Sequence, residues 1–181
     1  NGKPFGPTSQ AYADWAANQG KPVLTDEQHA MVVNIVGGIS AHETACALLS
    51  SGIPEGVARA DYGGLPCQSR LDWFNPDRGI VELKTCDDLT WFEADARRFG
   101  YAHQLAFYRS MLSIVTGTVF PIHMIAVEKK EPFRCGVWMI SAQTLDVAQC
   151  ENEAAIERLK QCETSTSWPT GYEEIRVFDC I

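Results

Sequence analysis

A turn-forming cluster between two apolar runs constrains this chain more than any other feature. Residues 75–79 read Asn-Pro-Asp-Arg-Gly, and apolar-rich runs flank them at 71–74 and 80–85. Turn residues between two such runs predict a β-hairpin. With 75–79 as the loop, Phe74 pairs with Ile80, and the same register continues back along both strands.

This register brings two carboxylates together, because Asp72 then pairs with Glu82. Side chains alternate along a strand, so Lys84 shares the face of Glu82, while Val81 and Leu83 point the other way. Like charges directly opposite one another destabilise a sheet, so we expect a cation between the two carboxylates. Two carboxylates and a lysine around a hard cation are the groups that metal-assisted phosphodiester cleavage uses.

These residues resemble the motif of the PD-(D/E)XK nuclease superfamily. Asp72 is followed, after nine residues, by Glu82-Leu83-Lys84. Leu71 stands where the family usually has a proline, which is a minor departure. Downstream, residues 101–108 (YAHQLAFY) resemble the Gln-x-x-x-Tyr helix of the RecB, RecE and lambda-type exonuclease branches.

A second stretch, upstream of the hairpin, resembles the RecE-like nucleases (the exodeoxyribonuclease VIII group). Ala41-His42-Glu43 is similar to their helix, and residues 50–55 (SSGIPE) are similar to the entry of the strand that follows. The resemblance as a whole covers about residues 27–113. Any one motif alone is a weak signal, but together they occur in the right order and at suitable separations.

The resemblance implies a fold of the α/β (α+β) class with a restriction-endonuclease-like core. A mixed central sheet of about five strands would be flanked by helices. We expect a single domain over residues 1–181, with 1–24 as an irregular N-terminal arm that includes a short helix near 10–17.

The resemblance also implies a deoxyribonuclease that hydrolyses DNA phosphodiester bonds with one or two Mg²⁺ (or Mn²⁺) ions. The expected activity is exonuclease action on duplex DNA ends in recombination or repair, as in phages and prophages. A single-strand annealing protein is an implied partner, and relatives form homo-oligomeric rings that thread DNA.

Roles within the site follow from the same resemblance. Asp72, Glu82 and Lys84 would be catalytic, with the two carboxylates and the Leu83 carbonyl as metal ligands and Lys84 acting on the attacking water and the phosphate charge. His42 would add a nitrogen ligand. His42 also lies on an apolar stripe at helical spacing, so a buried core histidine is the alternative.

The remaining candidate residues are less central to the expected site. Glu43 competes with His42 as the helix ligand. Gln104 and Tyr108 are four residues apart on one helix face, with Tyr101 three residues before Gln104, and would contact DNA beside the metal or else form a packing pair. Glu55 would support the site from its edge.

Two other functions stay open. One is a restriction or repair endonuclease on the same fold, and the other is a non-catalytic DNA-binding domain. The intact set of Asp72, Glu82 and Lys84 argues against the second, because adjacent buried carboxylates are costly to keep without a role.

Composition sets limits on these functions. The 181 residues suffice for one domain with a core. The net charge of −8 argues against non-specific coating of DNA, so phosphates would meet only a local basic rim. Seven cysteines without a C-x-x-C pair predict reduced thiols and a cytoplasmic protein rather than a zinc ribbon. No apolar run is long enough to span a bilayer, and no signal peptide is visible.

The element pattern agrees with a mixed sheet. Capping boxes at Thr25/Gln28 and Thr90/Glu93 predict two helix starts. Trp73, Trp91, Phe92 and Phe107 are expected in the core. The predicted helices cover about 26–50, 91–98, 101–115 and 142–162, and the predicted strands cover 55–60, 67–74, 80–84, 119–128 and 134–141.

Overall fold

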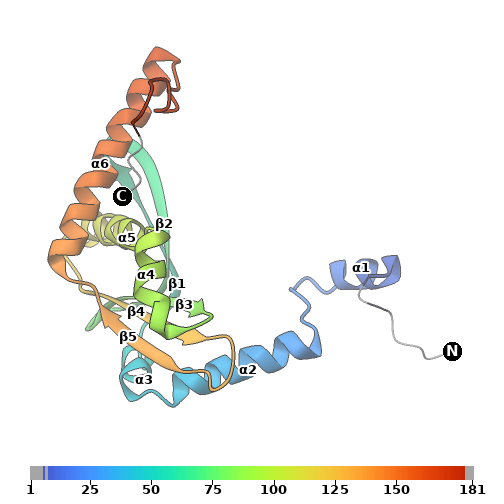
Figure 1. Cartoon of the computed structure of the whole chain (residues 1–181). Coiled ribbons are helices and arrows are strands. Elements are labelled where there is room, and N and C mark those ends of the chain that lie inside the picture. Colours follow the sequence, from blue (N-terminus) through green and yellow to red (C-terminus); the bar gives the residue numbers. More distant parts are fainter. Residues whose placement is uncertain (1–5, 7, 178–181) are drawn as a thin grey trace.

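In the part of the chain that the structure describes, five strands form one mixed sheet, and their order in space follows their order along the chain. The computed structural model describes residue 6 and residues 8–177 (Figure 1). The mixed five-stranded sheet with flanking helices confirms the predicted fold class. The strands are β1 (Ile53–Tyr62), β2 (Leu65–Asn75), β3 (Gly79–Cys86), β4 (Ile122–Glu128) and β5 (Cys135–Met139). The helices are α1 (Gln10–Ala17), α2 (Asp26–Ser40), α3 (Glu43–Leu49), the 3-10 helix η1 (Leu89–Trp91), α4 (Phe92–Arg98), α5 (Tyr101–Thr116) and α6 (Ala142–Ser165).

The hairpin of β2 and β3 has the predicted register, with Phe74 paired to Ile80. Asn75 is 1% exposed, and its side-chain oxygen accepts hydrogen bonds from the amides of Asp77 (2.9 Å) and Arg78 (3.1 Å). An asparagine side chain that bonds to the backbone ahead of it in this way closes a turn. Residues 75–79 therefore form the turn that the sequence predicted.

The end of this turn requires glycine. Gly79 has a φ of +95°, a conformation that side chains disfavour. A Cβ atom there would also collide with the carbonyl oxygen of Pro121. The amide of Ile80 donates to that same oxygen at 3.0 Å, so the close approach ties the start of β3 to the start of β4.

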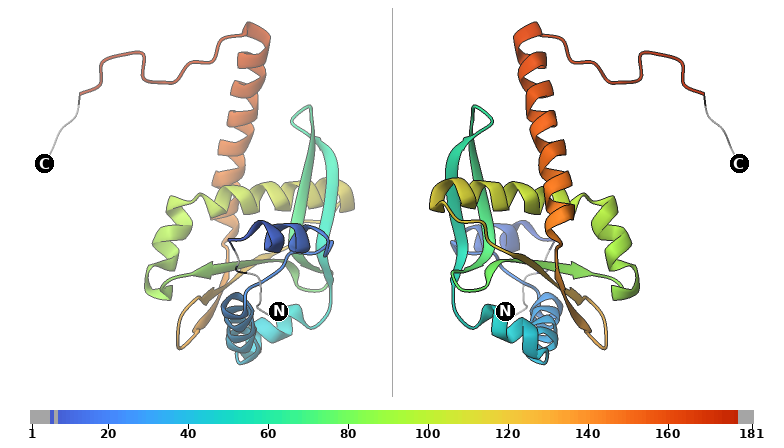
Figure 2. Two further views of the ribbon diagram at one scale, coloured as in Figure 1. Left: turned by 90° about the vertical axis from the view of Figure 1, so that its right-hand side faces the viewer. Right: turned by 90° about the vertical axis from the view of Figure 1, so that its left-hand side faces the viewer.

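The sheet combines a meander with one parallel connection. β1 and β2 are antiparallel, as are β2 and β3. β3 and β4 are parallel, and the crossover between them carries α4 and α5. β5 returns antiparallel to β4. A parallel pair needs a long crossover, which is commonly helical, so the two helices come to lie across the sheet (Figure 2).

Helices cover both faces of the sheet. α4, α5 and the start of α6 pack on one face in a cluster that includes Ile80, Leu105 and Leu145. α3 packs on the other face, where Ala45 contacts Val81 and its neighbours. The far part of the β1–β2 ribbon packs against α5 and the middle of α6. The face toward α5 is the one that carries the even-numbered residues of β3.

The single helix predicted over 26–50 is wrong, because the chain forms two helices with a bend of 99° between them. The Thr25/Gln28 capping box at the start of α2 is confirmed. His42 is the N-cap of α3, and its Nδ1 accepts a hydrogen bond from the amide of Ala45 at 3.3 Å. The bend lets α3 bury residues against the sheet, whereas α2 buries none.

Two further expectations fail near the start of α4. Thr90 and Glu93 do not form a capping box, because Asp88 caps η1 instead and accepts from the amide of Thr90 at 2.9 Å. The resulting short turn carries Trp91 outward, and this side chain is 65% exposed instead of packing in the core. Phe92, the next residue, is buried as expected.

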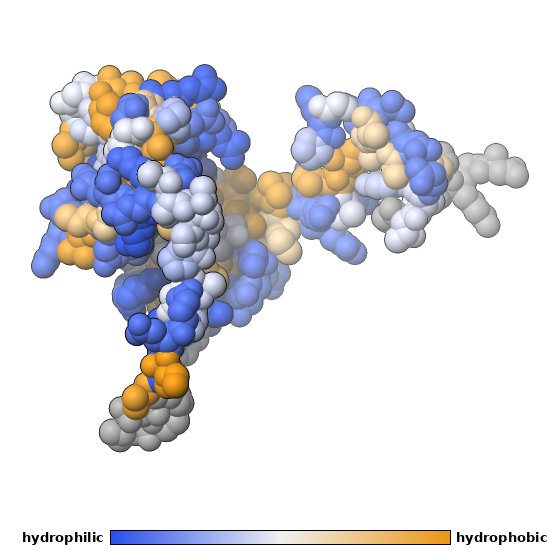
Figure 3. Space-filling model, turned by 90° about the horizontal axis from the view of Figure 1, so that it is seen from above, coloured by the Kyte–Doolittle hydropathy of each residue, from blue (hydrophilic) through white to orange (hydrophobic). Residues whose placement is uncertain are grey.

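The N-terminal part of the chain projects from the sheet. α1 and α2 contain no buried residues, and Figure 3 shows α1 standing apart from the body with apolar surface along the arm. In the described part of the chain, no helix by itself has the length and hydropathy to cross a membrane; α2 and α3 pass that test only jointly, despite their bend. The cysteines at 46, 67, 86, 135, 150 and 162 are free thiols.

Candidate active site

Glu82 lies in the middle of β3 and points toward α5. It is 2% exposed. Its Oε1 accepts a hydrogen bond from Lys84 Nζ at 2.6 Å, while its Oε2 is buried without a hydrogen-bond partner among the described residues. Burial raises the pKa of Glu82 and the charge of Asp72 raises it further, although the hydrogen bond from Lys84 acts in the opposite direction.

Asp72 lies across from Glu82 on β2. Backbone pairing between the strands extends to Trp73 and Val81, and the same register continued by one residue sets Asp72 opposite Glu82. Asp72 Oδ2 accepts a hydrogen bond from the amide of Leu83 at 2.9 Å. This bond takes the place of a backbone hydrogen bond between the strands and holds the carboxylate in position. The two carboxylates are brought together as the hairpin predicted.

Helix α5 supplies a side chain that bridges the ion pair. Gln104 Nε2 donates to Glu82 Oε1 at 3.1 Å and to the hydroxyl oxygen of Tyr108 at 2.9 Å. Gln104 Oε1 accepts from Lys84 Nζ at 3.1 Å. Lys84 Nζ also lies 4.7 Å from the centroid of the Tyr101 ring, a favourable position for a cation. One network therefore joins β3 to three residues of α5.

The residues present fit a divalent cation. A buried polar atom without a partner is rare and calls for an explanation such as an ion, and Glu82 Oε2 is such an atom. In residues 6 and 8–177, no group of three or more His, Cys, Asp and Glu residues could hold a metal. Mg²⁺ does not need one, because it keeps several waters and is commonly bound through one or two carboxylates plus substrate phosphates. The pair of Asp72 and Glu82 meets this requirement.

The structure does not gather the other predicted ligands with this pair. His42 caps α3 through Nδ1, and α3 packs on the sheet face that carries Val81, opposite to the face of Glu82. Glu43 is exposed in the first turn of α3. Coordination by His42 or Glu43 therefore stays a prediction.

Glu55 lies on β1, where the register sets it opposite Asp72. Its φ is +53°, and the ladder skips this position. Its carboxylate pairs with Arg70 at 2.8 Å, and both side chains are more than half exposed. A surface ion pair of this kind contributes little to stability, and the supporting role of Glu55 at the edge of the site stays a prediction.

Two neighbours of the site were not found by sequence reasoning. Met124 on β4 is the register partner of Glu82, and Trp138 on β5 is the partner of Met124. Side chains of paired residues share a sheet face, so all three point toward α4 and α5. Met124 is aligned with Glu82 by the parallel pairing of β3 and β4, two strands that α4 and α5 separate in the sequence. No local pattern in the sequence predicts such a pairing.

A mixed sheet with paired carboxylates and a lysine on its central hairpin defines a restriction-endonuclease-like fold of the PD-(D/E)XK class. Residues 8–180 match the family model described as a PDDEXK-like domain of unknown function (DUF3799). The chain belongs to this family, and the predicted superfamily is thereby confirmed, whereas the RecE-like branch stays a prediction.

Comparison with solved structures agrees on the fold. The crystal structure of a protein from Eubacterium rectale, described as a "putative exonuclease", superposes with a TM-score of 0.71. The two chains are 16% identical, and the match covers 94% of this chain and 70% of the other. No curated protein matches this sequence. At the level of the family, these findings support a nuclease.

Proposed function

We propose that this chain is a divalent-metal-dependent deoxyribonuclease. The observation that carries the proposal is the carboxylate of Glu82, which is buried beside Asp72 with a lysine at 2.6 Å and with one oxygen that has no partner in the part of the chain that the structure describes. A fold kept for structure alone has no use for this arrangement, since buried charge without full pairing is costly. A cation that binds both carboxylates removes the cost.

Each side chain of the network has a role in this proposal. Asp72 and Glu82 hold the metal, with the Leu83 carbonyl as a further ligand. When bound, Mg²⁺ or Mn²⁺ neutralises charge on the scissile phosphate and favours attack by water. Lys84 is fixed by Glu82 and Gln104, so its ammonium is positioned in advance to stabilise the negative charge that develops on the phosphate.

The residues of α5 orient the substrate. Gln104 is hydrogen-bonded to both Lys84 and Tyr108, so these two residues of α5 lie beside the lysine. They would contact the DNA backbone next to the scissile phosphate. Hydrogen bonds of this kind fix the position of the phosphate without reading base sequence. The net charge of −8 fits such a localised contact better than a broad basic surface.

Among deoxyribonucleases, we favour an exonuclease that acts on duplex ends in DNA recombination or repair in the cytoplasm. The resemblance of the Gln104/Tyr108 helix to the RecE and lambda-type branches supports this choice, and so does the description of the similar structure from Eubacterium rectale. A free DNA end would then be the substrate, with Mg²⁺ or Mn²⁺ as the metal.

End-labelled linear duplex and covalently closed circular duplex of the same sequence test the proposal. We expect degradation of the linear DNA alone, dependent on Mg²⁺ and abolished by EDTA. Glu82→Gln and Asp72→Asn should remove the activity, whereas Asp77→Asn, an exposed acid in the turn of the same hairpin, should retain it. Cleavage of the circle would indicate an endonuclease, and full activity of Glu82→Gln would refute the site.

A further inference from the structure

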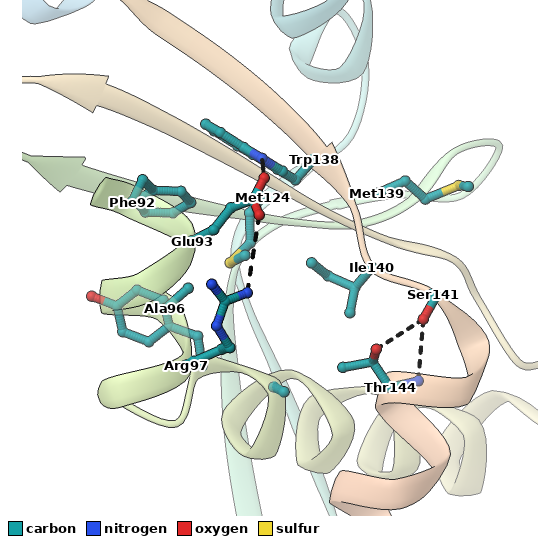
Figure 4. A pocket seen from close by; sticks show the side chains of 12 residues that line it. Phe92, Glu93, Ala96, Arg97, Met124, Trp138, Met139, Ile140, Ser141 and Thr144 are labelled. Atoms are coloured by element: carbon teal, nitrogen blue, oxygen red, sulfur yellow. Dashed lines mark hydrogen bonds and ion pairs between the residues drawn. The ribbon is translucent and has the colours of Figure 1, made fainter. Parts of the chain in front are cut away.

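A pocket adjoins the candidate site between α4, the end of β5 and the start of α6. Its volume is about 340 Å³, at the small end of the range for ligand sites, about 300–1,000 Å³. Figure 4 shows Glu93 and Arg97 from α4 on one side and Ile140 and Thr144 on the other. Trp138, Met124, Phe92 and Tyr101 complete most of the lining. The wall is thus mainly apolar and aromatic, with polar groups at its edge.

Two residues connect this pocket directly to the catalytic network. Tyr101 lines the pocket and holds Lys84 Nζ at 4.7 Å from its ring centroid. Met124 lines the pocket and is the strand neighbour of Glu82. Since adjacent strands lie about 5 Å apart, the pocket begins about one strand spacing from the carboxylate and extends to Trp138 on the next strand. A group in the pocket would therefore be a near neighbour of the scissile phosphate.

The charges around the pocket determine which part of a nucleotide can enter. Glu93 Oε1 accepts from Trp138 Nε1 at 3.1 Å, and Arg97 lies 4.0 Å from the same carboxylate. Arg97 offsets the charge of this carboxylate, so the wall has no net positive charge that would attract a phosphate, while the carboxylate can accept hydrogen bonds from amino groups of bases. The phosphate would instead lie at Lys84, whose Nζ is 4.7 Å from the centroid of the Tyr101 ring.

We propose that this pocket binds the nucleobase of the nucleotide next to the scissile phosphate. The inference rests on the proposed nuclease function and adds a base-binding subsite to it. Aromatic side chains bind bases by stacking without strong sequence preference. Trp138 and Tyr101 are both partly exposed, whereas Phe92 is buried and contacts Trp138 at a ring distance of 4.6 Å.

A base that enters this pocket must leave its stack. The subsite therefore favours substrates whose end is frayed, mismatched or already single-stranded, because unpairing such a base costs least. In this proposal, the enzyme holds a splayed terminal nucleotide by its base in the pocket and by its phosphate at Lys84.

Filling the pocket tests the proposal without making a cavity in the core. Ala96 lines the pocket, and Ala94 on the same helix is exposed and does not. Ala96→Leu is the test variant and Ala94→Leu is its matched control. Thr144→Leu, an exposed position on the opposite wall, gives a second test if Ala96→Leu folds poorly.

Single-turnover cleavage is measured on two DNA duplexes that differ only in the nucleotide next to the cleaved bond, which is natural in one and an abasic analogue in the other. We expect the wild type to prefer the natural substrate by about tenfold, the loss of one stacked base. Ala96→Leu should lose this preference through slower cleavage of the natural substrate, and Ala94→Leu should keep it. Calorimetry with Ca²⁺ should show weaker binding of dAMP, but not of 2-deoxyribose 5-phosphate, by Ala96→Leu.

The possible failures can be told apart. Equal wild-type rates on the two substrates, or equal behaviour of Ala96→Leu and Ala94→Leu, overturn the subsite and leave the nuclease proposal intact. Absence of metal-dependent cleavage of either substrate by folded wild-type protein overturns the nuclease function and the subsite with it.

Discussion

At the scale of single residues, Glu82 is under electrostatic strain that a ligand can relieve. Its carboxylate is buried near the charge of Asp72, and one of its oxygens has no partner among residues 6 and 8–177. Lys84 offsets only part of the cost, since burial still raises the pKa of Glu82. The residue is therefore suited to bind a cation and poorly suited to stabilise the protein in the absence of one.

Glu82→Gln should make the metal-free protein more stable at neutral pH. A raised pKa means that the folded state binds this proton more tightly than the unfolded chain, so stability falls as pH rises from the ordinary carboxyl pKa through the raised one. Glutamine resembles the protonated form and avoids this loss, and each kcal/mol gained raises Tm by about 2–4 °C in a chain of this size.

Thermal unfolding with and without Mn²⁺ checks this prediction. The wild type should gain stability with the metal, and the variant should start from a higher Tm and gain nothing. A variant with a lower metal-free Tm than the wild type would show that the Lys84 ion pair outweighs the cost of burial.

Lys84→Met should separate metal binding from catalysis. The ammonium is assigned a role in the transition state, so its loss should lower kcat by about 10²–10³-fold while the metal-induced rise in Tm persists. Lys129→Met is the control, because Lys129 pairs with Asp87 in an exposed ion pair outside the network. Loss of the metal-induced shift in Lys84→Met would mean that the lysine organises the carboxylates instead.

For single residues, the sequence predicted which side chains lie close together better than it predicted their hydrogen bonds. The pairing of Asp72 with Glu82 follows from the turn chemistry and the alternation of strand residues. The bridging position of Gln104 depends on how α5 lies across β3, which local sequence does not determine. Its two hydrogen bonds to the ion pair became visible only in the structure.

At the scale of elements, Glu128 at the end of β4 is a second buried carboxylate. It fixes the start of the crossover that connects β3 to β4. Glu128 is 1% exposed and accepts two hydrogen bonds from Arg134, at 2.9 and 2.6 Å. It also accepts from the amide of Leu89 at 3.0 Å. Unlike Glu82, this carboxylate is fully paired, and Arg134 lowers its pKa to about 2.

This pair should make the protein sensitive to acid. A pKa of about 2, against an ordinary value of 4.5, means that ionised Glu128 stabilises the fold above pH 4.5. That contribution is lost as pH falls from 4.5 through 2. Arg134→Met removes the partner, so its Tm should lie well below that of the wild type at pH 6, and the gap should narrow toward pH 2.5. Parallel curves would contradict the pairing.

The elements themselves were predictable where a local signal fixes them. The turn at Asn75 and the Thr25/Gln28 capping box depend on hydrogen bonds within a few residues, and the structure contains both as predicted. The bend at His42 does not follow from local pattern, because apolar spacing continues from α2 into α3. It arises from the gain of burying Ala45 against the sheet, which is a tertiary effect.

At the scale of the whole molecule, the sheet and the N-terminal arm are distinct in their packing. The helices on the sheet bury residues against it, whereas α1 and α2 bury none. α2 nevertheless reaches Val127 through Gly38, where a Cβ would lie 3.3 Å from a methyl group of that valine. The arm before α2 therefore has little part in the stability of the sheet.

Removal of residues 1–22 should leave Tm within about 2 °C of the full chain, a shift that corresponds to less than about 1 kcal/mol. The truncation keeps Thr25 and Gln28, so the cap of α2 is preserved. The metal-induced rise in Tm should also be unchanged, because no residue of the network lies in the arm. A larger loss of stability would show that α1 packs against the body in solution.

The order of the strands also bears on how the chain folds. Neighbours in this sheet are successive along the chain, so β1–β2, β2–β3 and β4–β5 can close as local hairpins, while β3–β4 must wait for the crossover of α4 and α5. Short-range pairings form before long-range ones because closing a small loop costs less entropy. We therefore expect Asp72 and Glu82 to meet early and Gln104 and Met124 to join them last. A partly folded chain would then have its two carboxylates together without the complete site.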